Sequence, residues 1–219
     1  MDYIAEVFSV DKIGYFGLFM MLVIAGLGLL ALVFFWERVL TLFGRCNVDK
    51  DRFMANVKSA VLAGDLNSAV NYCNDKNAPI NNVVKAGLTA VLNKGSTDDI
   101  QTSMDVAALR EVPKVERGTP FLSLFANIAT LMGLLTTIVG LVQGFSAVKT
   151  VDPAQKATML ADGIAVAMNG TAFGLLVAIP CLLGFAFLSA KTQRILDDLH
   201  EVSVSILNLI IQNKEKFSQ

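Results

Sequence analysis

The stretch FLSLFANIATLMGLLTTIVGLVQGFSAV, residues 121–148, contains no Asp, Glu, Lys or Arg. It exceeds the about 20 residues of helix that cross a hydrocarbon core about 30 Å thick. At 100° per residue, four of its polar side chains fall within roughly one third of the helix circumference: Ser123, Asn127, Thr130 and Thr137. A polar face at membrane depth must face protein or water, so this one predicts either an ion route between helices or hydrogen bonds that join them.

Two other windows, residues 16–35 and 164–190, also lack these charged residues and are long enough to span a bilayer. Charged residues make up 17% of the chain, below the about 25% that is typical of soluble domains. We therefore predict an all-α membrane protein with three transmembrane helices, at residues 16–38, 119–148 and 162–190. A net charge of −1 gives no indication of nucleic-acid binding.

The distribution of charge around the first window predicts the orientation of the chain. Residues 1–15 hold three acidic residues and a single lysine, whereas residues 38–52 hold four basic residues, which is the reverse of a cleaved export signal. Because cytoplasmic segments carry an excess of Lys and Arg, residues 1–15 are expected in the periplasm and residues 39–118 in the cytoplasm. The rest of the chain then divides into a periplasmic loop and a cytoplasmic tail, at residues 149–161 and 191–219.

Apolar residues recur at helical spacing in the predicted cytoplasmic region and again in the tail. Breaks at Gly64, Pro79 and Gly95 divide the region into three or four amphipathic helices. The region is small for an independent core, so we expect its helices to continue the transmembrane bundle or to pack against neighbouring copies. The tail is expected to extend the third span far into the cytoplasm.

The chain offers little for catalysis or metal binding. His200 is the only histidine, and Cys46, Cys73 and Cys181 lack the paired spacing of zinc or redox sites. We therefore predict no catalytic residues, no metal site and no cofactor, and an intramembrane enzyme is the least favoured class. Since no G-x-x-x-x-G-K-[ST] motif is present either, an ion gradient is favoured over ATP as an energy source.

Two segments resemble the pore helices of the MotA/TolQ/ExbB ion-channel family: PKVERGTPFLSLFANIATLMGLLTTIVGLVQGF, residues 113–145, and GIAVAMNGTAFGLLVAIPCLL, residues 163–183. The Trp-Glu-Arg sequence at residues 36–38 and the stretch GDLNSAVNYCNDKNAPINNVVKAGL, residues 64–88, are similar to ExbB and TolQ. The three spans also resemble ExbB and TolQ, because MotA has four.

This resemblance implies a homopentamer around a central pore in the bacterial inner membrane. It also implies that the pore holds a dimer of a single-span partner of the ExbD, TolR or MotB type, which carries the aspartate of the ion path. The expected function is that of a stator or motor subunit that converts the ion-motive force into mechanical work across the cell envelope. The chain is not expected to be an enzyme. TonB-dependent uptake, Tol-type envelope maintenance, gliding and flagellar rotation remain open. The alternative is a non-conducting membrane scaffold of the same family.

By position, Thr137 and Thr171 match the two threonines that the family uses along its ion path. The family's third-helix glutamate is replaced by Val166, so this chain loses the acid that would hold a proton. On an ideal helix Thr171 is turned about 140° from Val166. We therefore expect Thr171 at a subunit boundary, facing the second helix of its own or the next copy.

Three further residues are expected along the ion path: Thr130, Asn127 and Asn169. Thr130 and Thr136 replace a common proline and glycine of the family, and their extra oxygens leave Na⁺ as a less favoured alternative to the proton. Both hydroxyls could instead bond to carbonyls of their own helix. Asn169 either lines the lumen or makes a hydrogen bond between subunits.

Two structural expectations concern the ends and the packing of the pore helices. Asp162 precedes the third window and is expected to act as a helix-start carboxylate, with attraction of cations as the alternative. Gly133, Gly140 and Gly144 are expected to permit close approach of a second helix.

Overall fold

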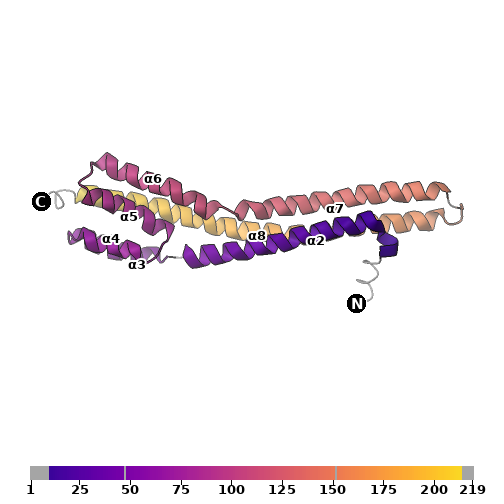
Figure 1. The fold of residues 1–219 in the computed structure, drawn as a ribbon, viewed down its shortest axis with the longest axis horizontal. Helices are drawn as coiled ribbons and strands as arrows, with labels where there is room; N and C mark the ends of the chain where they lie inside the picture. Colours follow the sequence, from indigo (N-terminus) through magenta and orange to yellow (C-terminus); the bar gives the residue numbers. More distant parts are fainter. Residues whose placement is uncertain (1–9, 47, 151, 214–219) are drawn as a thin grey trace. The chain divides into compact units, whose positions relative to one another are not determined.

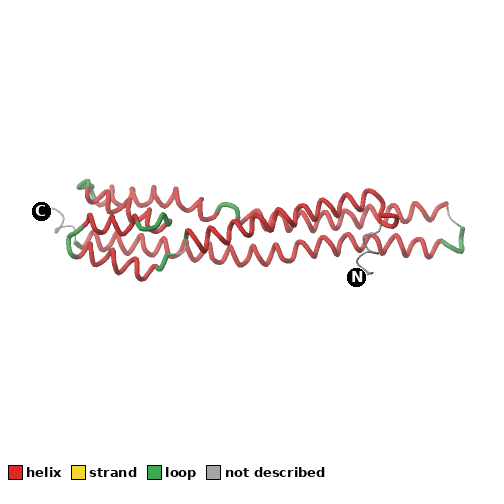
Figure 2. The backbone as a smooth tube through the Cα atoms, turned by 60° about the horizontal axis from the view of Figure 1, so that its bottom comes forward, coloured by secondary structure: helices red, strands yellow, loops and turns green. Residues whose placement is uncertain are grey.

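The computed structural model describes residues 10–46, 48–150 and 152–213, and every regular element in these ranges is a helix (Figures 1 and 2). Most of the predicted periplasmic segment, residues 1–9, lies outside the described residues. The chain divides into two compact units. We name the two units by their predicted locations. The membrane unit combines the described part of Met1–Trp36 with Gly118–Ala186, and the cytoplasmic unit combines Glu37–Arg117 with the described part of Phe187–Gln219.

Three helices supply the membrane unit: most of α2 (Val10–Leu40), α7 (Thr119–Ala147) and the first half of α8 (Lys156–Gln212). The helical stretches long and apolar enough to cross a membrane are Phe16–Gly44, Thr97–Ala147 and Lys156–Gln212. The prediction of an all-helical chain with three such helices is therefore confirmed. A short 3₁₀ helix, η2 (Val148–Thr150), follows α7.

The bounds of α8 differ from the predicted third span. The helix begins at Lys156, ahead of the predicted start at residue 162, so Asp162 lies in its second turn. The expectation that Asp162 starts the helix is therefore wrong. The helix continues through Pro180 without a break and ends at Gln212, which confirms that the tail extends the third span.

The cytoplasmic unit contains four helices between the first two spans, preceded by a π-helical turn, η1 (Thr41–Arg45). They are α3 (Lys50–Leu62), α4 (Leu66–Asn74), α5 (Pro79–Leu92) and α6 (Thr97–Glu116), with breaks where the sequence predicts them. Three of the four begin with a side-chain cap, which satisfies a backbone N–H of the first turn: Asp49 accepts from Arg52, Asp65 from Ser68 and Ser96 from Asp99.

These four helices share one apolar core with the second half of α8. The contributions of α8 to this core are fully or almost fully buried: Leu199, Val202, Ile206 and Ile210. Of the two expected arrangements, the structure has the one in which these helices pack on a continuation of the transmembrane bundle. Amphipathic helices of this length depend on such burial, because short isolated helices are marginal in water.

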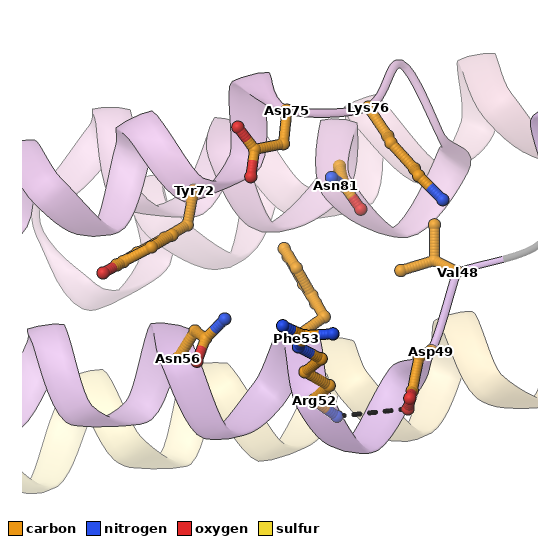
Figure 3. Close-up of a pocket in the computed structure, with 9 residues that line it drawn as sticks. All are labelled: Val48, Asp49, Arg52, Phe53, Asn56, Tyr72, Asp75, Lys76 and Asn81. Atoms are coloured by element: carbon orange, nitrogen blue, oxygen red, sulfur yellow. Dashed lines mark hydrogen bonds between the residues drawn. The ribbon is translucent and has the colours of Figure 1, made fainter.

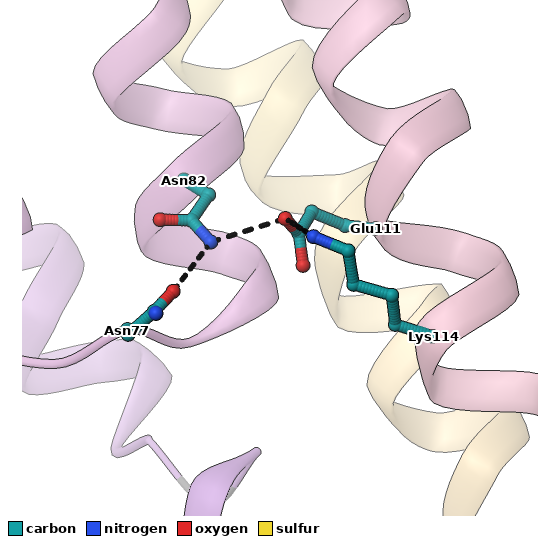
Figure 4. A network of polar contacts seen from close by, with 4 residues as sticks. All are labelled: Asn77, Asn82, Glu111 and Lys114. Atoms are coloured by element: carbon teal, nitrogen blue, oxygen red, sulfur yellow. Dashed lines mark hydrogen bonds and ion pairs between the residues drawn. The ribbon is translucent and has the colours of Figure 1, made fainter.

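A polar network links the start of α5 to α6 (Figure 4). The amide nitrogen of Asn82 donates to Oδ1 of Asn77 at 2.9 Å and to Oε1 of Glu111 at 3.2 Å. Nζ of Lys114 lies 2.6 Å from the same Glu111 oxygen. Because the Glu111 side chain is buried, these partners offset the cost of removing its carboxylate from water.

Burial raises the pKa of the Cys73 thiol to about 12, and its Sγ donates to the carbonyl oxygen of Ala69 at 3.4 Å. Since the thiolate is the reactive form, we predict that Cys73 in the folded chain reacts with iodoacetamide more than about a hundredfold slower than an exposed thiol. Mass spectrometry of a Cys46→Ser, Cys181→Ser chain at mildly alkaline pH measures this rate.

The matched control moves the thiol by one position, with Cys73→Ser and Asn74→Cys in the same background, because Asn74 is exposed. This control should label rapidly in the folded chain. Equal rates at positions 73 and 74 would contradict a buried Cys73.

Candidate functional site

A seam of small residues joins α7 to the first half of α8, which lie side by side in the membrane unit (Figure 1). A Cβ atom placed on Gly174 would lie 2.7 Å from the carbonyl oxygen of Ala129 and 3.0 Å from Cα of Gly133. A Cβ atom on Gly140 would lie 2.9 Å from Cβ of Ala167. The helices also approach closely toward the end of α7, where a Cβ atom on Gly163 would lie 3.1 Å from Cα of Gly144. The expected close approach at Gly133, Gly140 and Gly144 is therefore confirmed.

The side chains of Thr137 and Thr171 meet at this seam, and their hydroxyl groups hydrogen-bond to each other. The Thr137 hydroxyl also lies within hydrogen-bond distance of the carbonyl oxygens of Gly133, at 3.2 Å, and Ala167, at 3.3 Å. The Thr171 hydroxyl lies 3.2 Å from the Gly133 carbonyl oxygen. We call these four oxygens the threonine cluster. Thr171 thus faces the second predicted span of its own chain, one of the two expected positions.

Helical spacing explains how the threonine cluster forms. Thr137 follows Gly133 by four residues and Thr171 follows Ala167 by four, so each threonine shares a face with a small residue of its own helix. Small residues let the backbones approach, and carbonyls of both helices then come within reach of the hydroxyls. The two carbonyls were not among the predicted site groups, because only the spacing of small residues signals them in a sequence.

No hydrogen bond within the described ranges joins the other predicted ion-path residues to this cluster. Asn127 and Thr130 are exposed in the single chain, and Asn169 and Val166 are half-buried. The Thr130 hydroxyl donates to the carbonyl oxygen of Ala126 at 3.0 Å.

Thr136 behaves in the same way, since its hydroxyl donates to the Met132 carbonyl oxygen at 2.9 Å. Of the two alternatives for Thr130 and Thr136, the structure has the bond to the helix's own carbonyl. The extra hydroxyls are thus engaged within α7, which weakens the argument that they favour Na⁺.

The chemistry of the threonine cluster is that of neutral oxygens. Hydroxyls both donate and accept, so a pair of them can pass on a hydrogen bond, but neither holds a charge at neutral pH. Within the described ranges, no three His, Cys, Asp or Glu side chains come together as a metal site.

These features define an all-helical membrane protein with two closely packed helices that carry paired hydroxyls. Residues 75–201 match the profile of the MotA/TolQ/ExbB proton channel family, and the chain belongs to this family. Its members are channel and transport subunits, so the expectation of a protein that is not an enzyme is confirmed.

Curated relatives match about half of the chain. The Tol-Pal system protein TolQ of Pseudomonas aeruginosa is 34% identical over 99 residues, which cover 45% of this chain and 42% of the relative. The biopolymer transport protein exbB1 of Vibrio cholerae is 37% identical over 95 residues, which cover 43% of this chain and 41% of the relative. The matched stretches thus span less than half the length of these relatives.

A solved structure with a similar fold is that of C. jejuni MotAB. The similarity has a TM-score of 0.60 and covers 94% of this chain and 80% of that chain, with 17% identical residues. At this level of identity the similarity concerns the fold alone.

The seam yields a prediction for stability. Gly174→Ala should lower the free energy of unfolding by about 1–3 kcal/mol, because the added methyl group meets backbone atoms of α7 that cannot move aside. Thermal or denaturant unfolding of the purified protein in detergent measures the change.

Gly26→Ala provides the control, since Gly26 also lies within a helix but a Cβ there meets no atom within 4 Å. This substitution should be neutral or stabilising, because alanine favours helix over glycine. Similar losses for both variants would contradict close backbone contact at Gly174.

Proposed function

We propose that this chain is the ion-conducting subunit of a motor or stator complex in the bacterial inner membrane. The complex converts the ion-motive force into mechanical work across the cell envelope, together with a single-span partner of the ExbD, TolR or MotB type. The conducted ion is the proton, with Na⁺ as the less favoured alternative. The support comes from membership of the proton channel family and from the threonine cluster at the α7–α8 seam.

The threonine cluster is the observation that carries the proposal. Two hydroxyls and two carbonyl oxygens converge between helix segments that contain no charged side chains. Polar groups at membrane depth are costly unless they are satisfied, and they are frequently functional when they line a route between helices. Thr137 and Thr171 are therefore assigned to the ion path, and Asn127, Thr130 and Asn169 remain expected members along the same route.

A carboxylate from the partner completes this route. Val166 cannot hold a proton, and the neutral oxygens of the threonine cluster cannot hold one either at physiological pH. The proton carrier is then an aspartate on the partner helix. The threonine cluster provides hydrogen-bonding groups along the path of this aspartate. One charge that crosses 100 mV releases about 2.3 kcal/mol, so a few protons supply enough free energy to bias a conformational step.

The assembly belongs to the proposal as well. Five copies of the chain surround a central pore that holds a dimer of the partner helix, with the amino terminus in the periplasm and the carboxyl terminus in the cytoplasm. The exposed apolar side chains of α7, among them Leu131, Ile138 and Val142, provide surface for lipid or for neighbouring copies.

A non-conducting scaffold of the same family is the second candidate, and the apolar Val166 favours it. A scaffold would keep its function when an uncoupler collapses the membrane potential and the pH gradient, whereas a motor would stop. The uncoupler experiment in living cells therefore separates the two.

The ion-path assignment predicts that Thr137→Ala and Thr171→Ala each reduce coupled ion flux at least about tenfold, because each removes a hydroxyl of the threonine cluster. Proton flux into vesicles that hold the chain and its partner measures the effect. Thr136→Val is the matched control and should keep most of the flux, since the Thr136 hydroxyl bonds to the Met132 carbonyl of its own helix and is not part of the threonine cluster.

Assembly must remain intact for this comparison, and the size of the purified complex checks it. Full flux in both Thr137→Ala and Thr171→Ala would exclude the threonine cluster from the ion path.

The partner-carried route makes a separate prediction. Replacing the membrane aspartate of the partner with asparagine should abolish coupling, because position 166 of this chain offers no alternative acid. Val166→Leu should leave coupling unchanged, since the side chain stays apolar. Coupling that persists in the asparagine variant of the partner would show that the proton is carried elsewhere.

A further inference from the structure

A cavity of about 480 Å³ lies in the cytoplasmic unit, between the first turns of α3 and the segment that joins α4 to α5 (Figure 3). Cavities that hold small ligands occupy about 300–1,000 Å³, so its size is suitable for a small molecule. Its wall combines charged, amide and aromatic side chains, unlike the apolar core of the same unit. No residue of the proposed ion path lines it.

Two cationic side chains line the cavity from opposite walls. Arg52 belongs to the first turn of α3, and Lys76 follows the end of α4 (Figure 3). Neither takes part in an ion pair with any residue of the described ranges. A guanidinium group binds phosphate through two parallel hydrogen bonds and an ammonium group adds a point charge, so the pair is suited to a phosphate group.

The cavity also holds two carboxylates. Oδ1 of Asp49 accepts a hydrogen bond from the backbone N–H of Arg52 at 3.2 Å and is engaged as the cap of α3. Asp75 is exposed at the end of α4 and makes no ion pair within the described chain. Its carboxylate can accept from a hydroxyl group of a ligand but repels a second phosphate. The charges therefore favour a ligand with one phosphate and hydrogen-bond donors.

A buried amide marks the inner wall of the cavity. Asn81 is 2% exposed, and its Nδ2 donates to the carbonyl oxygen of Cys73 at 3.4 Å. Its Oδ1 accepts no hydrogen bond from the described residues. A buried acceptor without a donor is unfavourable, so a ligand hydroxyl that reaches this oxygen would contribute to binding.

The position of the cavity in the chain limits the source of such a ligand. Val48 lines the cavity and lies four residues after Gly44, the end of the first membrane-spanning stretch. Four residues extend over at most about 14 Å, so Val48 lies within that distance of Gly44. A phosphate ester with free hydroxyls can therefore come from the cytoplasm or from the headgroup of an anionic phospholipid.

We infer that the cavity binds a hydroxyl-bearing phosphate ester, with Arg52 and Lys76 on the phosphate and Oδ1 of Asn81 on a hydroxyl. The ring of Tyr72, at the rim, covers the carbon skeleton of the ligand. Because the ligand contacts α3 and the α4–α5 segment together, its binding holds these parts of the cytoplasmic unit in one arrangement.

The experiment uses the full chain and two probes. Glycerol 3-phosphate is titrated into the detergent-purified protein by calorimetry, and phosphatidylglycerol is offered in nanodiscs against phosphatidylcholine, with bound lipid counted by native mass spectrometry. The test variant is Arg52→Gln with Lys76→Gln. The control is Lys58→Gln with Lys85→Gln, which removes two exposed charges from α3 and α5 outside the cavity.

The test variant should bind at least one of the probes at least about tenfold more weakly, because each charge-assisted hydrogen bond to a phosphate contributes strongly to affinity. The control should bind like the native chain. Binding of glycerol 3-phosphate identifies a soluble ligand, and retention of phosphatidylglycerol alone identifies a lipid headgroup.

Two results would overturn the inference. One is that neither probe binds the native chain more tightly than the test variant. The other concerns Asn56→Cys, because Asn56 also lines the cavity. A disulfide between this cysteine and a neighbouring copy in the assembled protein would show that protein, and not a ligand, fills the cavity. An Asn81→Ser variant checks the inner wall, and it should weaken binding while the helical content stays unchanged.

Discussion

The close contact between the backbones of α7 and α8 is the constraint on which the rest of the membrane unit depends. Lipid chains are as apolar as leucine, so helices in a bilayer gain little from burying apolar surface against each other. Contact between small residues and hydrogen bonds across the seam provide the attraction instead. At Gly174 and Gly133 no side chain stands between the helices, and Thr137 therefore reaches Thr171 directly.

Under the proposed function, this arrangement divides the chemistry of transport between the chain and its surroundings. The threonine cluster offers hydrogen-bond donors and acceptors at fixed positions, but it holds no charge of its own. A channel wall of this kind keeps the same charge whatever the pH near neutrality. Any pH dependence of transport then comes from the ionisable group that moves along this wall. The positions of the wall oxygens determine where that group exchanges hydrogen bonds.

Sequence patterns predicted the parts of the fold that rest on local chemistry. Charge-free windows located the spans, and Pro79 and Gly95 located breaks between helices, because proline and glycine act on the backbone within one turn. The start of α8 at Lys156 was missed, since its first turns are polar and lie outside the apolar window. Family resemblance singled out Thr137 and Thr171, and helix geometry turned Thr171 toward a second helix, but the direct contact of the two hydroxyls was not predicted. Their carbonyl partners and the cavity beside Asn81 depend on tertiary packing, which no local pattern encodes.

The threonines of α7 bear on how the chain enters the membrane during synthesis. Thr130, Thr136 and Thr137 each hydrogen-bond to a carbonyl four residues earlier in the same helix. A helix whose hydroxyls bond to its own carbonyls can move from the translocon into lipid without a partner helix, at a low cost in free energy. The Thr171 hydroxyl instead bonds to Gly133 of α7. The Thr171 hydroxyl therefore gains this partner only once α8 lies against α7, the helix that precedes it in the chain.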